Sequence, residues 1–136
     1  TVSSQKLHDK IIYMDSIGKI VNEDDYVYFK IIKDYELDKS EYKTYKFNKE
    51  AVLVEEYTTS DRDGIYRNGE YIIYYPNGNK KKSTLFEDNR LVGKELIWYE
   101  NGNQMMENEY TFDLDSKKTI TRTFKFWNKE NISMQT

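Results

Sequence analysis

The chain has 136 residues, with 21 basic and 24 acidic side chains and a net charge near −3. This length fits one domain, and the balance of charge gives no electrostatic basis for binding nucleic acid. The absence of cysteine excludes disulfides, cysteine-based zinc sites and a cysteine nucleophile. Ala51 is the only alanine and aromatic residues make up 15% of the chain, which favours strands over a helical bundle.

The first predicted strand follows a terminal segment, residues 1–10, that we expect to be poorly ordered. Residues 26–32 alternate between two sets of side chains, and this period of two predicts a strand. The acidic run at residues 23–25 leaves an alternative open, because it would suit the start of a short helix.

Two stretches of the chain repeat each other at a spacing of 24 residues: YYPNGNKKKSTLF from residue 74 and WYENGNQMMENEY from residue 98. The ungapped alignment pairs Gly69 with Gly93, Tyr75 with Tyr99, Asn77 with Asn101, Gly78 with Gly102, Asn79 with Asn103 and Phe86 with Tyr110. A worn third copy covers about residues 45–57, where Tyr45 precedes Asn48 by three residues and Tyr57 follows it by nine. Self-similarity at a fixed period indicates a repeat architecture, with its clearest units at residues 69–92 and 93–110.

Asn-Gly between two alternating apolar runs predicts a two-residue hairpin. A type I′ turn needs positive φ at both central residues, which Asn and Gly tolerate best. We therefore expect turns at Asn77-Gly78 and Asn101-Gly102, joining residues 71–75 to 80–86 and residues 95–99 to 104–110. Asn89 with Gly93, and Asp61 with Gly64, are predicted to mark the turns between units.

Residues 119–127 alternate as an amphipathic strand with one solvated face, after a turn at residues 113–118. Residues 128–136 are expected to form a poorly ordered tail. The sequence therefore predicts an all-β protein, an antiparallel meander of stacked β-hairpins, in a single domain over residues 11–127.

The unit pattern Gly-x-x-apolar-apolar-aromatic-Tyr-x-Asn-Gly resembles the variant MORN repeat of bacterial proteins often labelled YwqK-like antitoxin components. The match is strongest over residues 69–110, and the stretch from residue 11 to 32 is similar to a lead-in before such repeats in proteins of Bacteroides-type bacteria. The resemblance implies stacked hairpins in one elongated, twisted sheet, and interaction or scaffolding rather than chemistry. The chain departs from the family where Tyr71 and Glu95 replace the usual Trp, and where Asn89-Arg90 replaces the usual second Asn-Gly.

The candidate binding surface is formed by the aromatic pairs before each Asn-Gly, which are Tyr74 with Tyr75 and Trp98 with Tyr99. Successive strand residues point to opposite faces, so both faces carry apolar side chains near the turns. In a single-layer sheet one face would leave an aromatic ladder exposed, as at binding hot spots. The alternative is that both faces are covered, by twist, by the termini or by a second copy of the chain.

No pattern indicates catalysis, a metal site or a cofactor. The only histidine, His8, lies in the terminal stretch, and no pair of carboxylates is distinguished by its spacing. DRDG (residues 61–64) and DLDS (residues 113–116) resemble fragments of calcium loops, but turn formation explains them. The lysines at residues 80–82 suit protection of a sheet edge better than lipid binding.

The predicted function is a non-catalytic repeat module that binds a protein partner through its aromatic face or a free sheet edge; an antitoxin that binds a toxin is one case. The alternative is a cell-envelope module that contacts glycan or lipid, and an enzyme would need a groove formed by sheet curvature. Self-association stays open. A chain that begins at Thr1 permits export, so a periplasmic or cell-envelope location is favoured over the cytoplasm.

Overall fold

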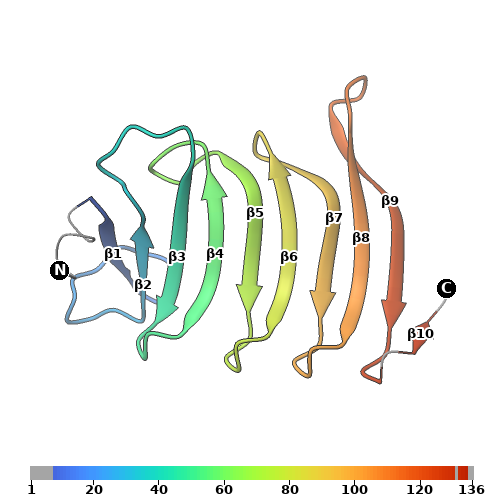
Figure 1. The fold of residues 1–136 in the computed structure, drawn as a ribbon, viewed down its shortest axis with the longest axis horizontal. Helices are drawn as coiled ribbons and strands as arrows, with labels where there is room; N and C mark the ends of the chain where they lie inside the picture. Colours follow the sequence, from blue (N-terminus) through green and yellow to red (C-terminus); the bar gives the residue numbers. More distant parts are fainter. Residues whose placement is uncertain (1–7, 131, 135–136) are drawn as a thin grey trace.

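The computed structural model describes residues 8–130 and 132–134, which form ten antiparallel strands in one sheet (Figure 1). Each strand pairs with the next along the chain, so the order in the sheet is the order in the sequence. The strands are β1 (Lys10–Met14), β2 (Tyr28–Ile32), β3 (Tyr42–Asn48), β4 (Leu53–Thr59), β5 (Arg67–Tyr74), β6 (Lys80–Glu87), β7 (Arg90–Trp98), β8 (Gln104–Asp113), β9 (Lys118–Trp127) and β10 (Ser133–Met134). The predicted all-β antiparallel meander is confirmed. Within this part of the chain, no helix is long or apolar enough to cross a membrane.

The strands cover most of the ranges expected from the alternation of side chains. The strand expected at residues 26–32 is β2, which begins two residues later. Residues 23–25 form a turn and not the start of a helix, because the backbone carbonyl and side-chain oxygen of Asn22 accept hydrogen bonds from the N–H groups of Asp25 and Asp24. The strand expected at residues 119–127 is β9.

Both terminal segments contain ordered structure where we expected disorder. Lys10 opens β1, and the nearly buried Asp9 carboxylate accepts hydrogen bonds of 2.8 Å from Lys33 Nζ and from the Asp34 N–H. At the other end, the Asn128 N–H donates to the Ile132 carbonyl at 2.9 Å, and β10 then pairs with β9. The rest of those expectations, at residues 1–7, 131 and 135–136, lies outside the described residues.

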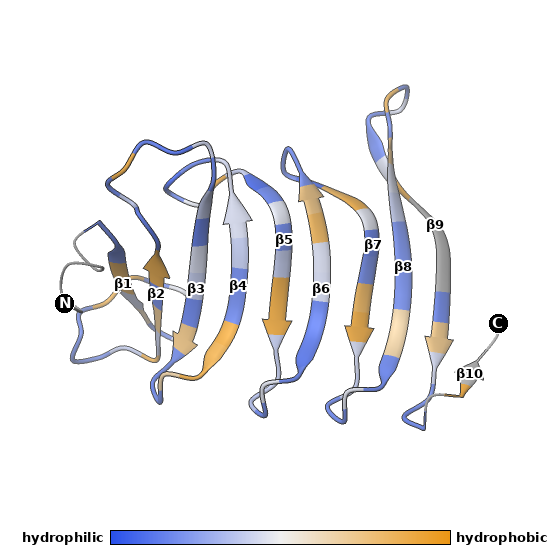
Figure 2. Cartoon of the chain, in the orientation of Figure 1, coloured by the Kyte–Doolittle hydropathy of each residue, from blue (hydrophilic) through white to orange (hydrophobic). Residues whose placement is uncertain are grey.

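The sheet is a single curved layer, so its fully buried side chains are few (Figure 1). The buried apolar residues are Met14, Ile32, Tyr42, Tyr57 and Ile72, and the buried polar residues are Thr44, Thr58, Thr59, Thr84 and Glu95. Apolar segments gather toward the ends of β4, β5 and β7 at the lower edge of the view (Figure 2). Contacts between neighbouring strands, and not a two-layer core, therefore provide most of the side-chain packing.

Each face carries its own group of aromatic contacts. On one face Tyr57 of β4 stacks on Tyr71 of β5, with ring centroids 5.0 Å apart and planes within 7°. On the other face, near the N-terminal end, Phe29 of β2 stacks on Phe47 of β3 at 5.1 Å. Such pairs contribute about 0.5–1.5 kcal/mol each beyond the area that they bury.

The Asn-Gly turns differ from the predicted type I′ geometry. The Gly78 N–H donates to the Tyr75 carbonyl at 2.9 Å, the Tyr75 N–H donates to the Asn79 carbonyl at 2.8 Å, and Asn77 does not have positive φ. The loop is thus a type I turn followed by a left-handed residue, Gly78, with φ of 92°. Pro76 occupies the second turn position, which its fixed φ favours. The prediction of a two-residue type I′ turn was wrong here, and the same bonds occur at residues 99–103.

A two-residue loop with positive φ at both positions occurs elsewhere, between β6 and β7. Asp88 and Asn89 have φ of 49° and 68°, and the flanking residues Glu87 and Arg90 pair. Asn89 thus marks a turn as predicted, but Gly93 lies inside β7. Asp61 and Gly64 lie in the turn expected there, where the Asp61 carboxylate accepts hydrogen bonds from backbone N–H groups of its own loop.

Gly69 lies where the pairing of β4 with β5 changes register. Tyr57 pairs with Tyr71 but Thr59 pairs with Arg67, which leaves extra residues in β5. Gly69 has φ of 119°, and a Cβ atom there would lie 3.0 Å from Thr58 Cβ. Gly93 lies at a similar shift, since Leu85 pairs with Val92 but Ser83 pairs with Leu96. The glycines that begin the two repeat units therefore serve irregularities of the sheet and not turns between units.

Candidate functional site

The candidate surface residues Tyr75 and Tyr99 link each hairpin turn to the next. Tyr75 Oη donates a hydrogen bond of 2.7 Å to the Trp98 carbonyl, and Tyr99 Oη donates one of 2.8 Å to the Trp127 carbonyl. Both side chains are half-buried. Their hydroxyl groups are occupied within the protein, so these two residues have a structural role.

The asparagines of the turns form a second set of links. Asn77 Nδ2 and Asn79 Nδ2 both donate to the Glu100 carbonyl, at 2.9 and 3.0 Å. Asn101 Nδ2 and Asn103 Nδ2 donate in the same way to the Lys129 carbonyl, at 3.1 and 2.8 Å. This explains why the chain repeats Asn-Gly-Asn: Gly makes the turn, and the two amides satisfy a carbonyl of the following turn.

Tyr74 and Trp98, the other two candidate residues, do not form a continuous ladder. They lie on β5 and β7, and β6 separates these strands. Two strand spacings amount to roughly 9.5 Å. Both side chains are half-buried, and burial together with the neighbouring Glu56 raises the pKa of Tyr74. The four aromatics lie at the same end of the strands, beside the hairpin turns, but they are spaced apart there.

Two further hairpins share the closing hydrogen bond of the Asn-Gly loops. They lie at residues 48–52 and 128–132. The first lies within the worn third copy expected at about residues 45–57, and the second was not expected from the sequence. The backbone N–H groups of Asn48 and Asn128 each donate to the carbonyl of the residue four positions ahead. Each Asn Oδ1 also accepts two backbone N–H groups of its loop. The available signal is a shared motif, FNKEAV from residue 47 and WNKENI from residue 127. Asn48 therefore matches Tyr75 of the next unit, and the earlier alignment of Asn48 with Asn77 was wrong by two residues.

Glu95, one of the two departures from the family pattern, is buried at the centre of a polar cluster. Its carboxylate accepts hydrogen bonds from Thr84 Oγ1 at 3.2 Å, Asn108 Nδ2 at 3.0 Å and Tyr110 Oη at 3.0 Å. Lys82 Nζ lies 3.4 Å away. Burial by itself would raise the pKa of Glu95, but the bond from Asn108, the Lys82 charge and the other two bonds together lower it. Every partner belongs to the sheet, so the cluster is structural.

Tyr71, the other departure, donates a short hydrogen bond to the Glu55 carboxylate. Burial, reinforced by Glu55, raises the pKa of Tyr71 well above its ordinary value. Lys46 pairs with the same carboxylate at 3.3 Å, and Lys30 Nζ donates to the Tyr57 hydroxyl at 2.8 Å. These contacts join β2 to β5 across one face and leave no free acid–base pair among them.

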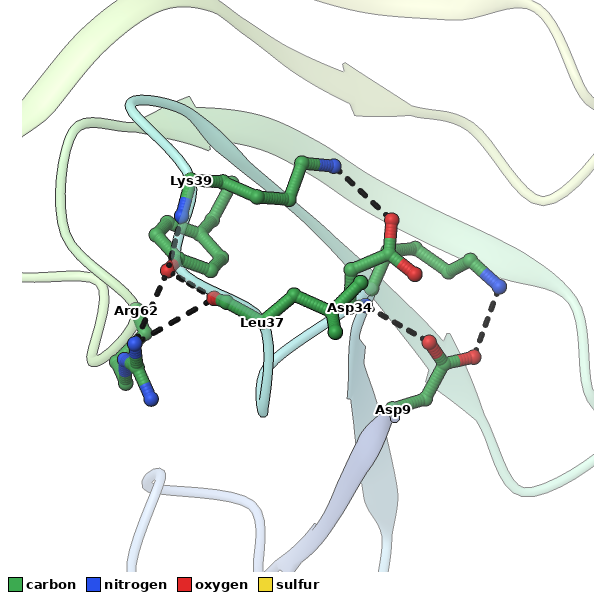
Figure 3. Close-up of polar contacts among 7 residues, drawn as sticks. Asp9, Asp34, Leu37, Lys39 and Arg62 are labelled. Carbon is green, nitrogen blue, oxygen red and sulfur yellow. Dashed lines mark hydrogen bonds and ion pairs between the residues drawn. The ribbon is translucent and has the colours of Figure 1, made fainter. Parts of the chain in front are cut away.

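The loop between β2 and β3 is held by a separate network (Figure 3). The Tyr42 hydroxyl donates to the Leu37 carbonyl at 2.5 Å and accepts from the Lys39 N–H at 3.0 Å. Arg62, from the loop between β4 and β5, lies 3.3 Å from the same hydroxyl and 2.7 Å from an Asp38 carboxylate oxygen. The network closes the loops onto the sheet, and its Arg and Asp side chains are used in doing so.

An open groove of about 730 Å³ lies between the turn after β6 and the hairpin of β8 and β9. The Arg90 guanidinium lies 4.1 Å from the Phe112 ring centroid. The groove is lined by Phe86, Asn89, Arg90, Leu91, Phe112, Leu114, Lys117 and Thr119. It combines aromatic and aliphatic surface with two cationic side chains.

The two edges of the sheet differ in how far they are covered. β1 is five residues long, and the following loop covers part of it, since Val21 donates to the Tyr13 carbonyl and Ile20 bridges to Met14. β9 is ten residues long, and on its outer side β10 pairs only with Phe126 and Trp127. In the described chain, residues 118–125 therefore have a strand on one side only. Unpaired backbone groups of this kind are a template for strand addition.

Comparisons with protein-family models, curated proteins and solved structures find no match for this chain. Within the residues that the structure describes, no three His, Asp or Glu side chains converge as a metal ion would require. Two features of the structure could bind a partner molecule: the outer edge of β9 and the groove beside it.

Proposed function

We propose that this chain is a non-catalytic, MORN-like repeat module that binds a protein partner, and that the partner adds a strand to the outer edge of β9. The single observation that carries the proposal is the unequal pairing of β9. Its inner side pairs with β8 from Asp113 to Met106, whereas its outer side pairs with two residues of β10 in the described chain.

The stacked turns support this role because they make the sheet a stiff scaffold. The hydrogen bonds between successive turns hold each hairpin against the next, beginning with Tyr75 and ending at the carbonyl of Lys129. A strand edge that is held in a fixed shape loses less conformational entropy when a partner binds. The polar clusters around Glu95 and Glu55 contribute to the same stiffness and leave catalysis without an obvious acid–base pair.

The test is affinity capture from native cell extract with three proteins. The edge variant carries Lys118→Glu and Lys125→Glu, both exposed on β9, and the matched control carries Lys80→Glu and Lys81→Glu, both exposed on the internal strand β6. We expect the wild type and the control to capture a specific protein that the edge variant loses. Capture of nothing beyond the chain itself would refute a protein-binding function. An antitoxin-type binder is the case in which the captured protein is a toxin.

A further inference from the structure

We infer that the partner segment is acidic and extended, and that it pairs with residues 118–125 of β9 while one of its side chains enters the groove beside this edge. This inference rests on the proposed function and specifies the chemistry of the partner. It is argued from the backbone of this edge, which has no described strand partner, from the charge of the edge, from the repulsion expected in a self-pair and from the position of the groove.

The backbone of β9 is already known to accept a strand on its outer side. β10 pairs antiparallel with Trp127 and Phe126 at the lower end of the strand. The adjoining eight residues, 118–125, continue the same edge without a described partner, and a register shift between residues 121 and 123 interrupts its regularity. An added strand would satisfy their outward N–H and C=O groups, which supply affinity in strand-addition complexes.

The charge of β9 selects the kind of segment. Its sequence, KTITRTFKFW, contains Lys118, Arg122 and Lys125 and no acidic residue. The strand that pairs with its inner side is acidic: Glu107 lies opposite Lys125, and Asp113 lies opposite Lys118. Lys125 remains 59% exposed and lies 3.7 Å from Glu107, which also pairs with Lys94. A second acidic strand on the outer side would meet the same lysines.

A second copy of this chain fits the edge poorly. If two β9 strands paired antiparallel over residues 118–125, Lys118 of each copy would lie opposite Lys125 of the other. Like charges directly opposite each other destabilise a strand pair. The edge is therefore suited to a segment of opposite charge and not to a symmetric dimer.

The groove adjoins the face of β9 that carries Thr119, and an added strand would place some of its side chains on this face. Thr119 pairs with Phe112 and belongs both to the free edge and to the lining of the groove. Side chains of an added strand alternate between the two faces, so those on the Thr119 face project beside the groove. Arg90 and Lys117 line it, and an acidic side chain would complement their charge.

The test uses isotope-labelled protein and a peptide with the β8 sequence, QMMENEYTFD, as the acidic probe. Within the protein this sequence forms β8, which pairs with the inner side of β9. The matched control peptide replaces Glu107, Glu109 and Asp113 by the neutral amides. We expect amide signals of residues 118–125 to shift and their hydrogen exchange to slow with the acidic peptide. The neutral peptide should bind at least tenfold more weakly, and added salt should weaken the acidic one.

Two protein variants complete the test. Lys118→Glu with Lys125→Glu should reduce affinity for the acidic peptide at least tenfold, and Lys80→Glu with Lys81→Glu should leave it unchanged. Equal affinity for the two peptides, signal changes confined to other strands, or no binding would overturn the inference. If the peptides fail but native extract still yields a protein lost by the edge variant, the acidic chemistry is wrong and the protein-binding function stands. If capture fails as well, both are wrong.

Discussion

The hydroxyl of Tyr75 donates a hydrogen bond of 2.7 Å to the backbone carbonyl of Trp98, a residue of the next hairpin. Tyr99 repeats this relationship with Trp127 at 2.8 Å. Because donor and acceptor belong to successive repeats, the bond couples one repeat to its neighbour. The repeated tyrosine is thus explained by the stacking of the turns.

Removing the hydroxyl of Tyr75 should weaken this coupling. We expect Tyr75→Phe to lower the free energy of unfolding by about 1 kcal/mol, because the hydrogen bond from the Tyr75 hydroxyl to the Trp98 carbonyl is lost. The double variant with Tyr99→Phe should lose about 2 kcal/mol, since the two bonds use different carbonyls. Urea denaturation measures both. Tyr66→Phe is the control, because Tyr66 is 57% exposed, and an equal loss there would contradict the prediction.

Ala51 occupies the turn position that glycine takes in the central repeats. Its φ is 63°, against 92° for Gly78. A left-handed conformation costs an L-residue about 1–2 kcal/mol, whereas glycine adds roughly 0.4–1 kcal/mol of unfolded-state entropy. We therefore expect Ala51→Gly to stabilise the protein by about 0.5 kcal/mol and Gly78→Ala to destabilise it. A lower melting temperature for Ala51→Gly would contradict this account of the turn.

Gly69 should tolerate a side chain less well than Gly78. Both have positive φ, but a Cβ at Gly69 would lie 3.0 Å from Thr58 Cβ, whereas nothing lies within 4 Å at Gly78. We expect the loss of stability in Gly69→Ala to exceed that in Gly78→Ala by about 1 kcal/mol or more, because a steric cost adds to the conformational one. Equal losses in parallel urea denaturation curves would show that β4 and β5 absorb the contact.

Glu95 should make stability depend on pH. At pH 7, Glu95→Gln should cost about 1–3 kcal/mol, because the carboxylate accepts bonds from Thr84, Asn108 and Tyr110 in a buried position. Its pKa is lowered in the folded state from an ordinary value of 4.5. The contribution is therefore present above pH 4.5 and is lost as the pH falls through the folded-state pKa.

The measurement for Glu95 is the stability difference between wild type and Glu95→Gln at pH 7 and pH 3. We expect the difference to shrink at the lower pH. Glu87→Gln serves as the control, since Glu87 is exposed at the end of β6. A difference that stayed constant over this range would mean that the Glu95 carboxylate does not stabilise the fold through its charge.

Local pattern predicted the meander because strand and turn signals lie within a few residues of each other. The alternation placed the strand starts at Lys80 and Gln104 as the structure has them. The turn type was missed because Pro76 and the Asn77 side chain favour a type I turn followed by Gly78. The hairpin at residues 48–52 was misaligned by two residues and the one at 128–132 was missed, because neither contains an Asn-Gly pair.

The sequence by itself determined the strand periodicity, the repeat and the absence of cysteine chemistry, since these depend on residue type and spacing alone. The tertiary structure decided which side chains found partners in other strands. Tyr75 and Tyr99 became links between turns, Glu95 became the centre of a buried cluster, and the outer side of β9 pairs, among the described residues, only at Phe126 and Trp127. The physical reason is that these outcomes depend on strand register, on the irregularities at Gly69 and on how the hairpins stack. Each of these is set by contacts between residues far apart in the chain.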